Sequence, residues 1–206
     1  MQGRPYVGAL TGSVVLLLMT LCVSCPSALA QTAGTPPVVV GSADAGLLSA
    51  PEASPRRGGI LRWGGLANST LYDLHQTGTI ANMGPQAPMY DLLVQIDPLN
   101  WNRIIPDLAQ RWQVAEDGLT YTFVLREGVQ FHDGAPLTAD DVVASFKHII
   151  FPPPGVISPR RGLFESVRDV VATDARTVEF RLKEPSSFFL RAIAAGFNVI
   201  VPKKTL

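Results

Sequence analysis

Cysteine is almost absent from this sequence. The two cysteines, Cys22 and Cys25, both lie within the first thirty residues. A chain that is cut after Ala30 therefore contains no thiol. This excludes both a disulfide framework and a cysteine nucleophile in the remaining chain.

An excess of charge of one sign is also lacking. Seventeen lysine and arginine residues balance seventeen aspartate and glutamate residues, so the formal net charge is +0. Nucleic acids and anionic membrane surfaces attract proteins with a strong basic excess. We therefore expect no nucleic-acid partner, and any partner must be inferred from motifs.

No apolar run reaches the roughly 20 residues that a membrane-spanning helix needs. The first thirty residues instead carry one charge, Arg4, then an apolar run over 14–23, then small residues that end in Ala28-Leu29-Ala30. This order is typical of a secretory signal. We predict a signal peptide over residues 1–30, with cleavage between Ala30 and Gln31, and a periplasmic or other extracytoplasmic location.

A lipid anchor is the alternative at this end of the chain. Cys25 follows the small residue Ser24, as lipoprotein processing requires, although Cys22 stands where leucine is usual. In that case the chain would be held at a membrane by a modified Cys25. The two alternatives stay open on the sequence.

Motifs for catalysis are missing as well. The sequence contains no G-x-S-x-G elbow, no H-E-x-x-H pair and no phosphate-binding loop. His132-Asp133 is better explained as part of a tight turn than as a metal or general-base site, because His75 and His148 show no ligand spacing with it. We therefore expect no catalytic residue, no metal and no cofactor. The alternative is that the protein is an exported hydrolase.

Two composition regimes follow residue 30. Residues 31–57 are rich in alanine, proline, glycine and serine, and they lack the apolar content needed to fold alone, so we predict a disordered linker. Residues 58–206 have the apolar periodicity of a folded domain. We expect them to form one α/β unit.

Within the folded part, local patterns predict individual elements. Apolar residues alternate with polar ones beside Asp-Gly and Asp-Ala-Arg turns, and they recur at helical spacing beside capping residues and prolines. The predicted elements are a strand over 60–63, a helix over 85–94, a hairpin over 112–125, a helix over 138–150, a hairpin over 167–182 and a helix over 185–195 that ends at Gly196.

Several ordered motifs resemble one family. They are Pro106-Asp107-Leu108-Ala109, Asp117-Gly118-Leu119-Thr120, Phe131-His132-Asp133-Gly134 and Leu137-Thr138-Ala139-Asp140-Asp141. This set resembles the family 5 extracellular solute-binding proteins, which serve importers of dipeptides, oligopeptides and, in some members, nickel. The resemblance implies a type II, cluster-C-like periplasmic-binding-protein fold whose first lobe has a mixed sheet, flanking helices and antiparallel hairpins.

The resemblance also implies a function. Two lobes close over a peptide or similar small solute, and the closed state meets an ABC permease with its ATPase. Family members are usually more than twice as long as this chain, so the sequence reads as the amino-terminal part of such a receptor. A fragment without activity of its own is the alternative.

The ligand-binding residues implied by the resemblance lie after the first predicted strand. The loop at Leu66, Ala67, Asn68 and Ser69 is expected to line the cleft, and Tyr90 is balanced between cleft wall and core. Asp140 and Asp141 are expected to begin a helix rather than act as an acid–base pair. Among the tryptophans, Trp63 and Trp112 are predicted core residues, whereas the role of Trp101 stays open.

Overall fold

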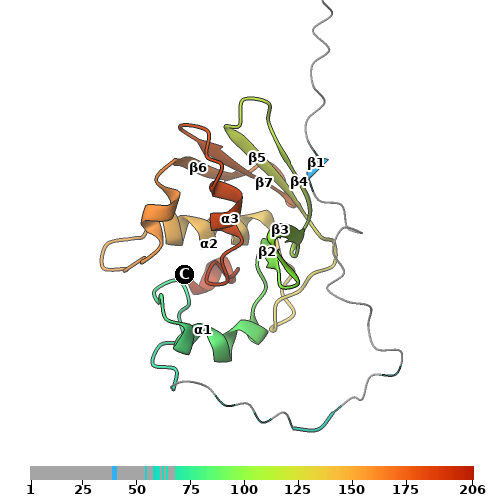
Figure 1. Ribbon diagram of the computed structural model, residues 1–206, viewed down its shortest axis with the longest axis vertical. Helices are drawn as coiled ribbons and strands as arrows, with labels where there is room; N and C mark the ends of the chain where they lie inside the picture. Colours follow the sequence, from blue (N-terminus) through green and yellow to red (C-terminus); the bar gives the residue numbers. More distant parts are fainter. Residues whose placement is uncertain (1–38, 41–53, 55–57, 61, 63, 65–67) are drawn as a thin grey trace, which may run out of the picture. The chain divides into compact units, whose positions relative to one another are not determined.

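A computed structural model describes residues 68–206, the backbone of 39–40, and positions 54, 58–60, 62 and 64. All of them belong to one unit, residues 35–206. Figure 1 shows their arrangement. The predicted sites for signal cleavage, Ala30 and Gln31, and for lipidation, Cys25, lie outside the described residues.

A five-stranded sheet forms the centre of this unit. Its strand order is β1-β4-β5-β7-β6. Every pairing between the described strands is antiparallel, whereas a mixed sheet was expected. The strands are β1 (Val39–Val40), β4 (Ala109–Val114), β5 (Thr120–Leu125), β6 (Val167–Ala172) and β7 (Thr177–Leu182).

Both predicted hairpins are confirmed. β4 pairs with β5, and β6 pairs with β7. The first turn includes Gly118 at a φ of 68°, the left-handed region that the Asp-Gly pair predicted. In the second turn, the Asp174 carboxylate accepts the backbone N–H of Arg176 at 2.8 Å.

β1 is an addition that the sequence did not predict. It lies within residues 31–57, which were expected to form a disordered linker. Val39 pairs with Gln113 and Val40 with Trp112, so this segment borders β4 on the side away from β5. A strand-like run of three valines, 38–40, is the signal in the sequence.

The predicted helix over 138–150 is present as α2 (Ala139–Ile150). Asp141 fixes its start, because one carboxylate oxygen accepts the Thr138 backbone N–H at 3.0 Å and the Thr138 hydroxyl at 2.7 Å. Asp140 and Asp141 thus occupy the first helical turn, as predicted.

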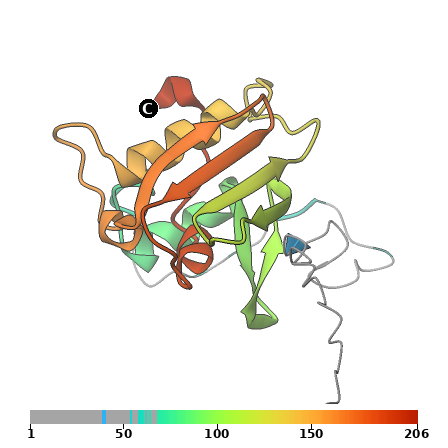
Figure 2. The same ribbon diagram turned by 90° about the horizontal axis from the view of Figure 1, so that it is seen from above.

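The helices α2 and α3 (Phe189–Ile193) pack on one face of the sheet (Figure 2). Phe180 of β7 lies at the centre of this core. Its ring lies 4.8 Å from that of Phe146 in α2 and 5.5 Å from that of Phe189 in α3. Trp112 is also buried, which confirms its predicted place in the core.

The helix predicted over 85–94 is wrong. The helix in this region, α1 (Ile80–Gln86), lies earlier, and a short 3₁₀ turn, η1 (Ala87–Met89), follows it. Pro88 cannot donate a backbone hydrogen bond and disfavours helical conformation at the residue before it. The chain becomes extended at Tyr90 and enters a second, two-stranded sheet.

That second sheet pairs β2 (Val94–Asp97) with β3 (Asn100–Pro106). This hairpin was not predicted, because the apolar run Leu92-Leu93-Val94 fits both helical and strand spacing. The hairpin extends from the body of the unit in Figure 2. Trp101 is exposed on β3, and its backbone carbonyl accepts a hydrogen bond from Arg191 at 2.8 Å.

The last predicted helix is shorter than expected, and its end differs. α3 stops at Ile193 rather than Ala195, and Gly196 is not its cap. Instead, the amide of Asn198 donates to the carbonyls of Ala192 and Ile193 at 2.7 and 3.2 Å. The side chain of Asn198 thus satisfies free carbonyls at the end of the helix. In helices that end with a left-handed glycine, backbone N–H groups fill this role.

The opening strand predicted over 60–63 is not seen at its described positions. Ile60 and Arg62 have no strand conformation, and Ile60 is 87% exposed. Residues 61 and 63, including the predicted core residue Trp63, lie outside the described part. Two short 3₁₀ segments complete the fold, η2 (Arg161–Phe164) and η3 (Lys203–Thr205). No helix among the described residues has the length and apolar character to cross a membrane.

Candidate functional site

The segment that follows the expected ligand loop is fastened to α1. The buried amide of Gln86 donates to the Ser69 hydroxyl at 3.0 Å and to the Leu71 carbonyl at 2.8 Å. The Asn82 side-chain oxygen accepts the Thr70 backbone N–H at 2.9 Å. Polar side chains on one helix therefore fix the path of the chain immediately after Asn68.

The predicted ligand-binding residues are thus only partly placed. Leu66 and Ala67 lie outside the described residues. Asn68 is exposed, and Ser69 is half-buried with its hydroxyl already engaged by α1. A role in binding ligand stays a prediction for all four.

Tyr90 lies between two cavities. One, called cavity A, has a volume of about 250 Å³, and the other, cavity B, about 200 Å³. Tyr90 is half-buried and lines both. Tyr90 is therefore a predicted site residue that borders open volume.

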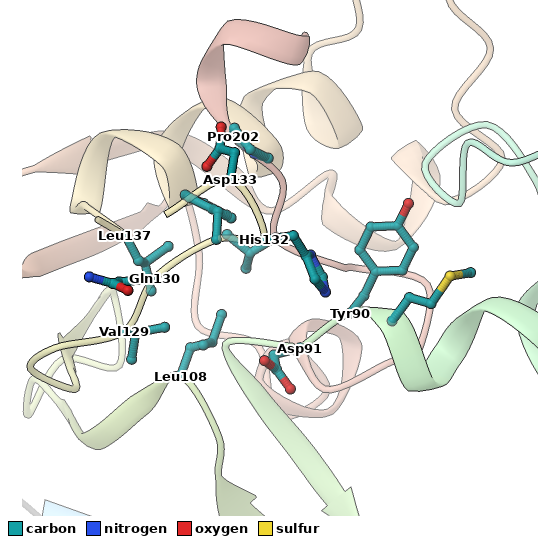
Figure 3. Close-up of a pocket in the computed structure, with 12 residues that line it drawn as sticks. Tyr90, Asp91, Leu108, Val129, Gln130, His132, Asp133, Leu137 and Pro202 are labelled. Atoms are coloured by element: carbon teal, nitrogen blue, oxygen red, sulfur yellow. The ribbon is translucent and has the colours of Figure 1, made fainter. Parts of the chain in front are cut away.

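Cavity A is lined by both apolar and polar side chains (Figure 3). Leu108 is buried and Val129 and Leu137 are half-buried, whereas Asp91 and His132 are exposed. This cavity was not predicted from the sequence, because its walls come from three segments far apart in the chain. They are residues 89–91, 129–137 and 200–202, with Leu108 below.

The turn at His132-Asp133-Gly134 is confirmed, and it forms one wall of cavity A. Gly134 has a φ of 81°, and Asp133 accepts the Ala135 backbone N–H at 3.0 Å. A hydrogen bond from the Lys204 ammonium and that backbone bond lower the pKa of Asp133. Asp133 is therefore held as a carboxylate by the turn and by an ion pair.

Asp107 lies close to cavity A, next to Leu108. Its carboxylate accepts the Leu92 backbone N–H at 2.9 Å. Burial raises the pKa of Asp107 to about 6, and the nearby Asp91 carboxylate adds to the increase. This group connects the end of β3 to the strand-like segment that carries Tyr90 and Asp91.

Arg160 is a buried cation that the sequence did not single out. Its guanidinium donates to the carbonyls of Thr77 and Leu74, each at 2.6 Å, and to that of His75 at 3.0 Å. It also lies 4.7 Å from the centre of the Phe197 ring. Burial lowers the pKa of Arg160 to about 10.

A third cavity, of about 600 Å³, lies at the end of α2 beside η2. Arg161, Glu165, Lys183 and Glu184 are among its lining residues. None of the predicted site residues lines this third cavity. Within the described part of the chain, no three histidine, cysteine, aspartate or glutamate residues gather so that they could hold a metal ion.

Comparison with known proteins decides the family. The family description "Bacterial extracellular solute-binding proteins, family 5 Middle" matches residues 103–205, half of the chain. The chain belongs to this family. Family 5 proteins are solute-binding receptors rather than a family of enzymes, which agrees with the resemblance of the motifs at 106–109, 117–120, 131–134 and 137–141.

Individual relatives support the assignment. The chain is 36% identical over 132 residues to the dipeptide-binding protein of Escherichia coli K12, a match that covers 57% of this chain and 24% of that one. It is similar to the dipeptide-binding protein of Pseudoalteromonas sp. SM9913 in complex with Met-Leu. That match has a TM-score of 0.62 and 27% identity, covering 68% of this chain and 31% of that one.

A further solved structure that resembles this chain contains a different ligand. The periplasmic binding protein AgaA of A. tumefaciens R10, in complex with agropinic acid, matches with a TM-score of 0.60 and 28% identity over 68% of this chain and 27% of that one. These structures confirm the periplasmic-binding-protein fold. The chain spans about a quarter to a third of the length of the proteins it matches.

Proposed function

We propose that this chain is part of an extracytoplasmic receptor that binds peptides or similar small solutes and delivers them to an ABC permease driven by its ATPase. The observation that carries the proposal is the position of Tyr90, half-buried in the wall between cavities A and B. An aromatic side chain beside open volume can contact a small solute without a specific charge partner.

The relatives and these cavities support the proposed ligand class. Proteins similar to this chain include one bound to the dipeptide Met-Leu and one bound to agropinic acid. Cavity A combines apolar side chains with the exposed Asp91 and His132. Small solutes with both apolar and charged groups, of which short peptides are the main example, suit such a lining.

Contact with Ser69 and its neighbours belongs to the same proposal. α1 holds the segment after Asn68 through Asn82 and Gln86. A loop that is fixed at its exit loses less conformational entropy when it orders around a ligand. We propose that residues 66–69 reach the solute from this anchored base.

We also propose where the protein is located and how it contacts the membrane. The secretory pattern over residues 1–30 supports export, with cleavage after Ala30 or, as the alternative, anchoring through Cys25. Contact with the membrane would then occur through the transporter or a lipid anchor. No sequence feature supports a nucleic-acid partner.

Thermal unfolding tests whether this chain binds solutes. The full chain is heated alone and with a mixed pool of dipeptides to hexapeptides, and then with Met-Leu by itself. A ligand present at 100 times its Kd stabilises the folded state by about 2.7 kcal/mol, which raises Tm by several degrees. We expect a cooperative transition that moves upward with the peptide pool.

A matched pair of variants identifies the site. Tyr90→Ala should reduce the peptide-induced increase in Tm, because it removes the wall shared by cavities A and B. Trp101→Ala is the control, since Trp101 is an aromatic residue that is 71% exposed on β3 and lines neither cavity. Melting without any peptide-induced shift would overturn the proposal for this chain and favour an inactive fragment.

A further inference from the structure

Two histidines from distant parts of the chain meet inside the unit. His75 precedes α1, and His148 lies in the last turn of α2. Their Nδ1 atoms are 3.3 Å apart, and their ring centres are 5.5 Å apart. His75 is buried, with 2% exposure, and its Nε2 lies 2.8 Å from the carbonyl oxygen of Val199.

These contacts determine how many protons the pair can hold. A carbonyl oxygen only accepts, so Nε2 of His75 must carry a hydrogen and donate it to Val199. In neutral His75 the Nδ1 atom is then an acceptor, and the N–H on Nδ1 of His148 donates to it. A second proton on His75 is accommodated only while neutral His148 carries its hydrogen on Nε2 and accepts at Nδ1. Once both rings are charged, two N–H groups face each other across 3.3 Å.

Charged groups around His75 do not remove this conflict. Asp73, on the same segment, favours a charged His75, but its carboxylate is already occupied by the His75 backbone N–H at 2.8 Å and by Gln76 at 2.7 Å. His148 on α2 and Arg160 before η2 both oppose a positive charge. Burial is the largest effect, and the pKa of His75 is lowered in consequence.

The pair joins three parts of the candidate site. His75 belongs to the segment that continues from Ser69 and Leu71 and also lines cavity B, as do Tyr90 and Val199. His148 connects this segment to α2 and thus to the core. Within the described structure, the histidine pair and the buried Arg160 hold residues 74–77 from two sides.

We propose that the His75–His148 pair is a pH-sensitive latch, closed when it shares a single proton between the two Nδ1 atoms and opened when acid charges both rings. Opening frees residues 74–77 from α2 and from Val199. Because this segment continues from Ser69, acid would loosen the base of the expected ligand loop. That last consequence rests on the proposed function, whereas the latch itself does not.

The direction of the pH effect follows from the unfolded state. In the unfolded chain His75 gains a proton near the ordinary histidine pKa of 6.5, but in the folded chain it does so at lower pH. The contribution of the latch is therefore complete above pH 6.5 and is lost as the pH falls below that value.

Histidine NMR of the full chain without ligand provides the test. The sequence contains three histidines, His75, His132 and His148, so each imidazole resonance can be followed separately. Neutral His75 is expected to show the tautomer with hydrogen on Nε2 and to titrate below 6.5. Backbone amides of residues 74–77 should lose at least about threefold in exchange protection between about pH 7.5 and pH 5.

His148→Asn separates the latch from other acid effects. Asparagine places a non-titrating amide near the position of Nδ1, and it can donate to neutral His75 or, after rotation, accept from charged His75. We expect this variant to lose the pH dependence of protection at residues 74–77. His132→Asn, on the exposed turn, is the control and should keep it.

Two results would overturn the latch. One is an unchanged protection of residues 74–77 across this pH range in the unmodified chain. The other is a His75 ring that titrates at or above 6.5, a result that needs no variant to fold. These measurements contain no ligand, so a negative result bears on the latch alone. The peptide-dependent Tm tests solute binding separately.

Discussion

Single residues in this unit are constrained by backbone conformation. Gly134 has a φ of 81°, and a Cβ added there would meet nothing within 4 Å. Its glycine requirement is therefore purely conformational, because side chains with a Cβ disfavour the left-handed region. The sequence predicted this turn from Asp133-Gly134 alone.

Gly134→Val should destabilise the fold by about 1–2 kcal/mol, a loss of roughly 2–8 °C in Tm. Differential scanning calorimetry measures the change. Gly162→Val is the matched control, since Gly162 also has open space around it but does not have a left-handed φ. Equal Tm values for the two variants would show that the turn assignment is wrong.

Asp107 is the residue whose titration should be visible in stability. Its pKa rises from 3.8 in the unfolded chain to about 6 in the folded chain, so the folded state binds the proton more tightly. Stability should fall as the pH rises from 3.8 to about 6 and then level off. The fall is no more than about 3 kcal/mol, and solvent screening at this partly exposed group reduces it.

Asp107→Asn removes this contribution while its side-chain oxygen can still accept the Leu92 N–H. Urea unfolding at several pH values should show a flatter profile between pH 3.8 and about 6 for the variant than for the unmodified chain. Asp117→Asn serves as the control, because Asp117 lies on an exposed turn. Parallel profiles for the unmodified chain and Asp107→Asn would contradict the prediction.

Whole elements differ in how far they could be predicted. The hairpins and α2 depend on patterns within about twenty residues, and they were predicted correctly. The region from α1 to β2 was not, because Leu92 and Leu93 fit two periodicities and their packing partners lie far along the chain. Leu92 bridges Val199, and the Leu93 carbonyl accepts the Ala109 N–H.

The candidate site was likewise predicted only in part. Tyr90 was singled out from the resemblance, but the cavities on its two sides are built from segments that meet only in three dimensions. The contacts of His75 with His148 and of Arg160 with residues 74–77 span 73 to 86 positions in the sequence. Neither periodicity nor motif spacing carries information at that distance.

The element α1 should act as the anchor of the segment after Asn68. Gln86→Ala removes the amide that donates to Ser69, Leu71 and Asn82, and it should cost about 1–3 kcal/mol. Urea unfolding gives the change in free energy. Gln113→Ala, an exposed glutamine on β4, should cost less than about 0.5 kcal/mol. Similar losses in both variants would mean that α1 does not anchor this segment.

At the scale of the whole unit, one aromatic cluster joins the sheet to both helices that cover it. Phe180 contacts Phe123 on β5, Phe146 on α2 and Phe189 on α3. Its removal therefore affects every layer at once. A chain in which this core is intact should unfold in one cooperative transition.

Phe180→Ala should destabilise the unit by about 3–5 kcal/mol because it leaves a cavity at the centre of the core. Chemical denaturation of the variant and of Phe188→Ala provides the comparison. Phe188 is 51% exposed, so its truncation should cost far less. A small loss for Phe180→Ala would show that the helices and the sheet are not one cooperative unit.

β6 forms one border of the five-stranded sheet, with β7 as its neighbour in the described structure. Two features make this border a poor template for another chain. Arg168 and Asp169 place opposite charges within the strand, and the register shifts between Val167 and Asp169. Charged and irregular borders resist edge-to-edge association, so β6 should keep neighbouring copies of the protein from joining into larger aggregates.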